Sequence, residues 1–355
     1  MPTVRSLARA LGLSAATVSN ALAGHGRIAA ATQQRVRNAA LAAGYAHNPL
    51  TGTLMSALRR SRGHTFRGVL AAVELHEPQR PPHGAFHREL LVGARARAEQ
   101  LGFKLTEFCV GQDDLTVTRL DYVLRARGIH GVLLLPAWNS PDWSQLDWSH
   151  YAGIYTDYNV GRPMLHTVCC NHYRSMMLTL ARLAERGYSR PGLFLERARN
   201  ERIHHRWGAG FHAFQESTTR ANAVPPLFTS EIKRETFVAW FRRHRPDVVV
   251  SHHTETIAWM ESCGARVPET HGFLCLNLLY KKRPCAGLDQ QPRELGARSV
   301  EMLIAQLQRN ERGVPEWPTT TTIPARWVEG PTLRRAENRD AEKPEEQATE
   351  LAAAS

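Results

Sequence analysis

The chain has 355 residues, a length that at about 100–200 residues per domain suggests two or three domains. Hydrophobic residues make up 43% and charged residues 22%, the composition of an ordinary soluble globular protein. No apolar run reaches the ~18 residues of a membrane span, we find no signal peptide, and the six cysteines lack zinc-ribbon or finger spacing. We therefore exclude membrane, secreted-miniprotein and structural-zinc proteins and expect a cytoplasmic location.

Positive charge is concentrated at the start of the chain. The formal net charge is +12, and residues 1–73 contain nine arginines, no lysine and no acidic residue. A segment without any carboxylate is typical of a surface that binds a polyanion such as DNA. A solvated basic face is the alternative interpretation.

The first 43 residues predict three short helices. Apolar residues recur at helical spacing over 4–11, Thr3 is placed as the N-cap of this helix, and Gly12 stands where it would end. Ser14 is a suitable N-cap for a second, short helix, and a third is predicted over 30–43. A helix, a glycine turn and a short helix form a helix-turn-helix motif, in which the second helix enters the major groove.

A series of residues with definite spacing runs through about 55 positions of this region. It comprises Leu7-Ala8, Gly12-Leu13-Ser14, Ala16-Thr17-Val18-Ser19, Thr32 with Arg35-Val36, Gly44-Tyr45, Asn48 and Leu54. In order and spacing the series resembles the DNA-binding head of the lactose-repressor (LacI) family of transcriptional regulators. The DNA contacts that we expect on this basis come from Thr3, Ser14, Ala15, Ala16, Thr17, Ser19, Asn20, Asn48 and Leu54.

The resemblance places three of these residues at base-reading positions. The amide of Asn20 can form a bidentate pair with adenine, whereas Ala15 and Ala16 offer only apolar contact, for example to a thymine methyl group. Many family members have arginine where Asn20 stands, so we expect the guanine contact of that arginine to be absent. Thr17 and Ser19 would contact phosphates and Asn48 would steady the backbone contact; simple helix propensity is the alternative explanation for the two alanines.

Residues 48–66 correspond to the hinge of that family. The resemblance implies a short helix that forms only on operator DNA, where Leu54 of each subunit wedges into a central minor-groove base step. Pro49 and Gly52 make this segment a poor helix by itself, which suits a segment that orders on binding. A plain Gly/Pro linker is the alternative.

Beyond residue 67 the pattern changes to short apolar runs separated by helical stretches. The predicted strands are 68–74, 104–110, 131–136, 154–158, 167–171, 191–196, 247–251, 272–277 and 286–289. Strands that alternate with helices form parallel sheets of the doubly wound type. We therefore predict a small all-α head followed by an α/β core of two doubly wound parallel-sheet lobes.

The core also resembles the LacI family, through its periplasmic-binding-protein-like effector domain. The segments that carry this resemblance are 246–250, 266–277, 288–308 and 321–330. It implies two lobes joined by three crossovers, which we place near 161–163, 290–292 and 324–327. The predicted domains are a head over 1–47, a hinge over 48–66, one lobe from 67–162 with 291–323, the other from 163–290 with 324–330, and a disordered tail over 331–355.

A small effector, usually a sugar or nucleobase in that family, would bind between the lobes. The residues that we expect to contact it are His83, Phe86, Asn171, Arg202, Arg206, Trp207, His253 and Asn277. Several depart from the family pattern: asparagine stands at 171 and 277 where aspartate is common, and Trp207 stands where arginine is common. Either the effector is unusual, less polar or anionic, or small-molecule control has been lost; we favour the first, with a carbohydrate-like effector.

The sequence shows no nucleotide-binding loop, nucleophile elbow or zinc-protease motif. The histidine pairs 204–205 and 252–253 suggest metal binding, but neighbouring residues on a strand point to opposite faces, so we expect no metal and no cofactor. We predict a homodimeric regulator that is not an enzyme, a repressor acting on a pseudo-palindromic operator in double-stranded DNA. An enzyme on the α/β core is the remaining alternative.

Overall fold

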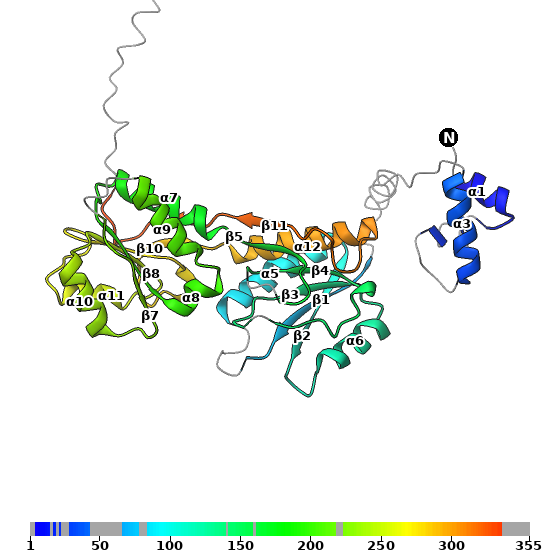
Figure 1. The fold of residues 1–355 in the computed structure, drawn as a ribbon, viewed down its shortest axis with the longest axis horizontal. Helices are drawn as coiled ribbons and strands as arrows, with labels where there is room; N and C mark the ends of the chain where they lie inside the picture. The colour runs from blue at the N-terminus through cyan, green and yellow to red at the C-terminus, as the bar shows by residue number, and fades with distance from the viewer. Residues whose placement is uncertain are drawn as a thin grey trace, which may run out of the picture.

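The computed structural model describes residues 4–14, 17–18, 21–22, 28–42, 66–77, 84–139, 141–158, 161–217 and 223–335. They form an N-terminal helical head and two α/β lobes, each built on a six-stranded sheet (Figure 1). Among these residues no helix is both long and apolar enough to cross a membrane.

The head contains two well-defined helices around its own apolar centre. Helix α1 (Val4–Leu11) ends at Gly12, which has the left-handed φ of 66° predicted for it. Helix α3 (Ala30–Ala42) packs against α1, and Arg35 from α3 donates a hydrogen bond to the carbonyl oxygen of Leu11 at the end of α1 (2.7 Å). The buried centre comprises Leu7, Ala8, Val18, Ala21, Val36 and Ala40.

Lobe 1 is a parallel sheet in the order β11-β5-β4-β3-β1-β2. Its strands are β1 (Gly68–Leu75), β2 (Phe103–Val110), β3 (Gly131–Leu134), β4 (Ala152–Tyr155), β5 (His166–Cys170) and β11 (Thr320–Ile323). Its helices are α5 (Ala85–Gln100), α6 (Val117–Ala126) and α12 (Pro292–Arg309). Strands β3 and β4 are buried along their whole length, which explains their continuous apolar sequence, because helices cover both faces of such a sheet.

Helices α5 and α12 lie in direct backbone contact along one seam. A Cβ atom on Gly93 of α5 would stand 1.9 Å from the carbonyl oxygen of Arg293, and one on Gly296 of α12 would stand 2.1 Å from that of Leu90. Only glycine allows the two backbones to approach this closely.

Lobe 2 has the sheet order β12-β10-β9-β8-β6-β7, in which only β12 is antiparallel to its neighbour. Its strands are β6 (Pro191–Glu196), β7 (Leu227–Thr229), β8 (Val248–Ser251), β9 (Gly272–Cys275), β10 (Ala286–Asp289) and β12 (Arg326–Val328). Its helices are α7 (His172–Glu185), α8 (Arg197–Arg202), α9 (Arg206–Ser217), α10 (Arg234–His244) and α11 (Thr256–Glu261). The described 3₁₀ turns include η1 (Trp148–His150) in lobe 1 and η3 (Leu278–Tyr280) in lobe 2.

The chain crosses between the lobes three times. The second crossover lies at 290–291, between β10 and α12, and the third at 324–325, between β11 and β12. The first lies after Cys170, and the placement near 161–163 was wrong. Strand β5 pairs with β4 and β11, so residues 163–170 belong to lobe 1.

The first residues of the predicted disordered tail are part of the folded core. Leu333 is 5% exposed, and Thr332 donates a hydrogen bond to the carbonyl oxygen of Phe273 and accepts one from the amide of Ala286. The prediction of disorder over 331–355 was therefore wrong for 331–335. It missed these contacts because they join residues far apart in the sequence; residues 336–355 lie outside the described part of the chain.

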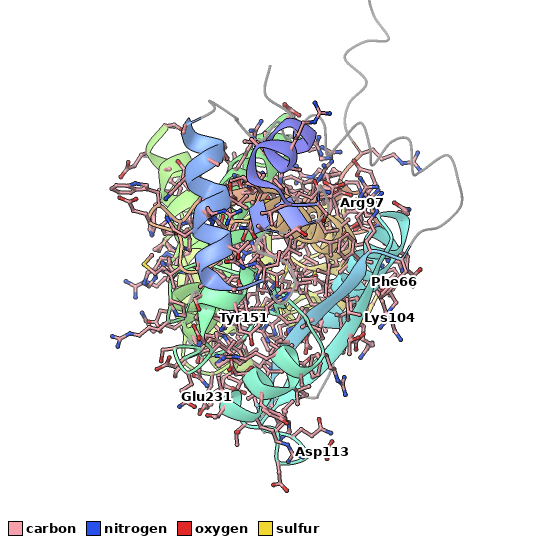
Figure 2. The ribbon with its side chains drawn as sticks, turned by 90° about the vertical axis from the view of Figure 1, so that its right-hand side faces the viewer. Phe66, Arg97, Lys104, Asp113, Tyr151 and Glu231 are labelled. Carbon is pink, nitrogen blue, oxygen red and sulfur yellow. The ribbon has the colours of Figure 1, made fainter. Side chains whose placement is uncertain are left out.

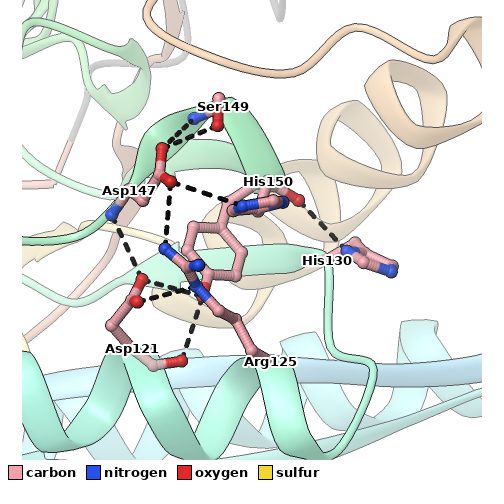
Figure 3. Close-up of polar contacts among 7 residues, drawn as sticks. Asp121, Arg125, His130, Asp147, Ser149 and His150 are labelled. Atoms are coloured by element: carbon pink, nitrogen blue, oxygen red, sulfur yellow. Dashed lines mark hydrogen bonds and ion pairs between the residues drawn. The ribbon is translucent and has the colours of Figure 1, made fainter. Parts of the chain in front are cut away.

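Lobe 1 also carries a network of paired charges next to α6 (Figure 3). Arg125 bridges Asp121 (2.8 Å) and Asp147 (2.9 Å), and the hydroxyl of Tyr151 donates to Asp121 (2.9 Å). These bonds hold the segment before β4 against α6, with every charge in the network paired. At the edge of the same sheet, Phe66 lies beside Lys104 at the start of β2, while Asp113 lies beyond the other end of that strand (Figure 2).

Candidate effector cleft

A cleft lies between the two lobes, at the carboxyl ends of their parallel strands. This is the position at which open α/β sheets bind ligands. Lobe 1 and α12 contribute Phe86, His87, Pro136, Trp138, Thr156, Asp157, Cys169, Cys170 and Leu295 to its lining, and lobe 2 with the adjoining Gln290 contributes His172, Arg199, Arg202, Ile203, Trp207, His252, Asn277, Tyr280 and Gln290. The volume open to the centre of a water molecule is about 90 Å³, enough for several waters or a small ligand.

Three rings form a row on the lobe 2 side of the cleft. The ring centroid of Trp207 lies 4.6 Å from that of His172 and 6.3 Å from that of His252. His172 is only 7% exposed, and the Nδ1 atoms of both histidines are buried without a hydrogen-bond partner in the described structure. The row therefore presents to the cleft only the edges of largely buried rings, with two polar atoms that have no partner among the described residues.

Burial keeps both imidazoles neutral. Burial and then the charges of Arg202 and Arg206 lower the pKa of His172 to about 3. Burial, reinforced by the charge of Arg199, likewise holds the pKa of His252 well below its usual range. A neutral imidazole has one donor and one acceptor nitrogen, so these side chains can meet either kind of ligand group.

Two arginines reach the cleft from α8, and each is paired with a carboxylate. Arg202 forms an ion pair with Asp157 and donates to the carbonyl oxygen of Ala137 (3.1 Å), thereby linking the two lobes. Arg199 pairs with Glu196, whose pKa is lowered to about 2 by His253 and Arg199. Both guanidinium groups lie 5.7 Å from the ring of Trp138, at cation–π distance.

Four of the residues predicted to contact an effector line this cleft: Phe86, Arg202, Trp207 and Asn277. His83 lies outside the described residues. Asn171, Arg206 and His253 are not among the lining residues, because each is engaged elsewhere.

The reasons differ for these three side chains. Asn171 caps α7 by accepting from the amide of Arg174 (3.0 Å), and its amide group donates to Thr322 (3.0 Å). Arg206 stacks over Tyr158, with its guanidinium carbon 3.9 Å from the ring centroid. His253 turns toward Glu196, 3.8 Å away.

Sequence reasoning missed most of the other lining residues. His172 directly follows the predicted strand 167–171, and Arg199 stands three residues after the predicted strand 191–196, a position that indicates the ligand edge of a parallel sheet. Trp138 lies four residues after the end of β3 and Asp157 two residues after the end of β4, although Asp157 fell inside the predicted strand 154–158. This shared position is the signal that could have identified them.

In the head, only two of the predicted DNA contacts are described. The Ser14 hydroxyl accepts a hydrogen bond from the amide of Thr17 (3.0 Å), as expected of the N-cap predicted for the second helix. In the head, Arg9, Arg35 and Arg37 are exposed. The remaining predicted contacts, Thr3, Ala15, Ala16, Ser19, Asn20, Asn48 and Leu54, lie outside the described residues.

The described residues contain no group of three or more His, Cys, Asp or Glu side chains that could hold a metal ion. Cys169 and Cys170 line the cleft, and burial raises the pKa of the Cys169 thiol to about 12. These two thiols therefore stay protonated and act as apolar lining.

Comparisons with known proteins agree with this architecture. Residues 180–333 match the model of the periplasmic binding protein-like domain. Among curated protein sequences, none matches the chain.

Several solved structures share the fold. The transcriptional regulator CelR in complex with cellobiose is 17% identical, with a TM-score of 0.54, and the match covers 94% of this chain and 100% of that one. The Lac repressor dimer bound to operator and the anti-inducer ONPF is 15% identical, with a TM-score of 0.55, covering 94% and 99%. A LacI-family regulator from Rhizobium etli is 14% identical, with a TM-score of 0.60, covering 75% and 99%. At these identities the likeness establishes the fold, and it confirms the resemblance and the fold class predicted from the sequence.

Proposed function

We propose that this chain is a LacI-type transcriptional regulator that binds a specific DNA sequence through its head and a small molecule in the cleft between its lobes. The observation that carries the proposal is the combination of two parts in one chain. Helix α1 ends at Gly12, Ser14 accepts a hydrogen bond from the Thr17 amide, and residues 17–18 and 21–22 are helical, as a helix-turn-helix requires; the core has the interlobe cleft of a ligand-binding protein. A regulator needs both parts, and an enzyme on the same core would not need the head.

The electrostatics of the head support DNA as its partner. Arg9, Arg35 and Arg37 are exposed, and the sequence contains no carboxylate before Glu74 that could neutralise them. Phosphate contacts by such arginines release counterions, so affinity for duplex DNA should fall steeply with salt concentration.

The assembly that we propose is a homodimer of cytoplasmic regulators on a pseudo-palindromic operator, acting as a repressor. Two heads related by a two-fold axis read two half-sites, so the symmetry of the site mirrors that of the protein. Within each chain, residues 1–47 would form the reading head, 48–66 the hinge with Leu54 as the wedge, and the two lobes the sensor.

In this proposal, Ala15, Ala16 and Asn20 read bases, and Thr3, Ser14, Thr17, Ser19 and Asn48 contact or support the backbone. The effector would lie against Phe86, Arg202, Trp207 and Asn277 in the cleft. A regulator that no longer responds to a small molecule is the second candidate, favoured by the engagement of Arg202 and Asn171 within the protein itself.

Selection of duplexes from a random pool by the purified full chain tests the proposal. We expect enrichment of a pseudo-palindromic site. Asn20→Ala should relax base preference at one position in each half-site, by about 1–3 kcal/mol. Failure to enrich any sequence would refute sequence-specific binding, and equal affinity of both proteins for all bases at that position would refute the role of Asn20.

A further inference from the structure

The chemistry of the cleft lining says what kind of effector it would hold, and this inference rests on the proposed function above. The first observation concerns helix termini. Phe86 and His87 in the first turn of α5, His172 at the start of α7, Trp207 at the second position of α9 and Leu295 in the first turn of α12 all line the cleft. Helix N-termini carry partial positive charge and unused amide donors, which together favour anions.

Two of these termini receive no capping hydrogen bond from the side chain of the residue before the helix. Gly84 before α5 has no side chain that could cap the helix, and Gln291 before α12 makes no capping hydrogen bond, whereas Asn171 caps α7 and Asn200 accepts from the Gly208 amide in α9 (3.1 Å). The free amides of such a turn must be satisfied by water or by a ligand.

The second observation concerns charge. The lining contains two arginines and one carboxylate, and that carboxylate, Asp157, is already bound to Arg202. Glu196 and Glu74 lie behind the lining, paired with Arg199 and with His87. Both oxygens of Asp157 already accept hydrogen bonds, from Tyr158 and Arg202, whereas each arginine has five N–H donors and keeps some beyond its carboxylate pair.

The third observation is the pair of unused imidazole nitrogens. His172 is more than nine-tenths buried, lines the cleft, and has no hydrogen-bond partner for Nδ1. A buried polar atom without a partner is costly unless a ligand or water completes it. Because the ring of His172 packs 4.6 Å from that of Trp207, which is 1% exposed, a ligand that reaches Nδ1 of His172 would meet the edge of this aromatic row.

We propose that the cleft binds a small ring compound that carries an anionic oxygen group. The ring packs against Trp207, and the anionic group lies toward Arg199, Arg202 and the helix N-termini, with His172 completing its hydrogen bonds. Carboxylates and phosphates share this chemistry, since the planar guanidinium group matches both.

The test uses the full chain and matched probes: D-glucose with D-glucuronate and D-glucose 6-phosphate, and benzyl alcohol with benzoate. Binding is measured by titration calorimetry and by the rise in melting temperature at about 10 mM probe. We expect at least one anionic probe to bind more tightly than its neutral partner; the sugar and aromatic arms identify the ring, and the carboxylate and phosphate arms identify the group. Tighter binding by the neutral partners, or no binding by any anionic probe, would overturn the inference.

Three variants assign the binding to the cleft. Arg202→Gln should weaken the anionic probe by about 10–100-fold, the value of one hydrogen bond to a charged group; Arg199→Gln replaces it if that variant does not fold. Asp157→Asn should strengthen the same probe, because Arg202 loses its internal partner, whereas a neutral ligand would gain nothing from this change. Arg95→Gln, which removes an exposed guanidinium paired with Glu107 outside the lining, is the matched control and should leave binding unchanged.

These outcomes are separable from failure of the proposed function. If duplex selection succeeds but only neutral probes bind, the proposed regulatory function is supported and the proposed anionic effector is refuted. If an anionic probe binds while no duplex is enriched, the proposed effector class is supported and sequence-specific DNA binding is refuted. An affinity that Arg202→Gln leaves unchanged and Asp157→Asn lowers would contradict the assigned orientation.

Discussion

Arginine plays opposite parts in the head and in the cleft. In the head, Arg9, Arg35 and Arg37 are exposed in a segment without a single carboxylate, whereas Arg199 and Arg202 at the cleft each pair with one. Unpaired exposed charge attracts a polyanion over a distance and is screened by salt. A paired and partly buried charge attracts little at long range and acts through short-range hydrogen bonds. Salt should therefore affect binding by the head, whereas single substitutions should affect binding in the cleft.

The largest expected effect comes from removing the head. Deleting residues 1–65 should abolish binding to the selected duplex, while the lobes stay folded, because their four apolar clusters contain no residue of the head. Fluorescence anisotropy of labelled duplex and thermal melting followed by circular dichroism measure the two properties. Full duplex affinity in the truncated protein would place the DNA-binding surface on the lobes.

The next largest effect should come from the cleft, where the aromatic row is also part of the core of lobe 2. Trp207 is 1% exposed and belongs to a buried cluster, so Trp207→Ala should lower the free energy of unfolding by about 3–5 kcal/mol. Denaturant unfolding of the full chain checks this. Trp317→Ala is the control, since Trp317 is 79% exposed and its removal should cost no more than about 0.5 kcal/mol.

Acid should lower the folding stability of the protein, because His172 in the cleft stays neutral in the folded state. The pKa of His172 is lowered to about 3 in the folded protein, against about 6.5 when unfolded. The unfolded state therefore binds more protons as pH falls below ~6.5, and folding stability falls with pH by up to about 1.4 kcal/mol per unit for this group.

The measurement is chemical unfolding of the chain and of His172→Phe between pH 7.5 and about 5. Since all other titrating groups are common to both proteins, the variant should show a shallower loss of stability on acidification. Parallel curves would mean that His172 is protonated at the same pH in both states.

The smallest effects should come from removing a single helix cap, once in the head and once in lobe 1. Ser14→Ala removes the acceptor for the Thr17 amide and should cost the head about 0.5–2 kcal/mol, which weakens duplex binding and leaves the melting of the lobes unchanged. Thr116→Ala removes the equivalent cap of α6. It should lower the melting temperature of the lobes and leave duplex binding unchanged. If each variant changed both duplex binding and the melting of the lobes, the head and the lobes would not fold as independent units.

The head was the most predictable part of the molecule because its signals are local. Caps, the glycine turn and apolar spacing lie within a few residues of the helices they define, and α1 and α3 follow their predicted ranges closely. Strand β11, by contrast, was not predicted, because it is stabilised by pairing with β5, about 150 residues earlier in the chain. The short strands β7 and β12 were missed for the same reason.

The cleft was predictable only in part. Trp207 and Asn277 stood out as departures from a family pattern, and both line the cleft. Asn171 stood out equally, yet it serves as a helix cap, while its neighbour His172 faces the cleft. A shift of one residue along the chain decides which side chain faces the cleft, and the spacing of residues in the sequence does not predict it to within one position.

The glycine seam between α5 and α12 determines where the molecule can move. With Gly93 and Gly296 bringing the two backbones into contact, α12 cannot slide or rotate on α5 without a clash. At 1.5 Å per residue, its 18 residues make a stiff rod about 27 Å long that starts at the cleft and is fixed to lobe 1 along its length. Any opening or closing of the lobes must therefore pivot in the three connecting segments, and lobe 1 must travel as one rigid piece.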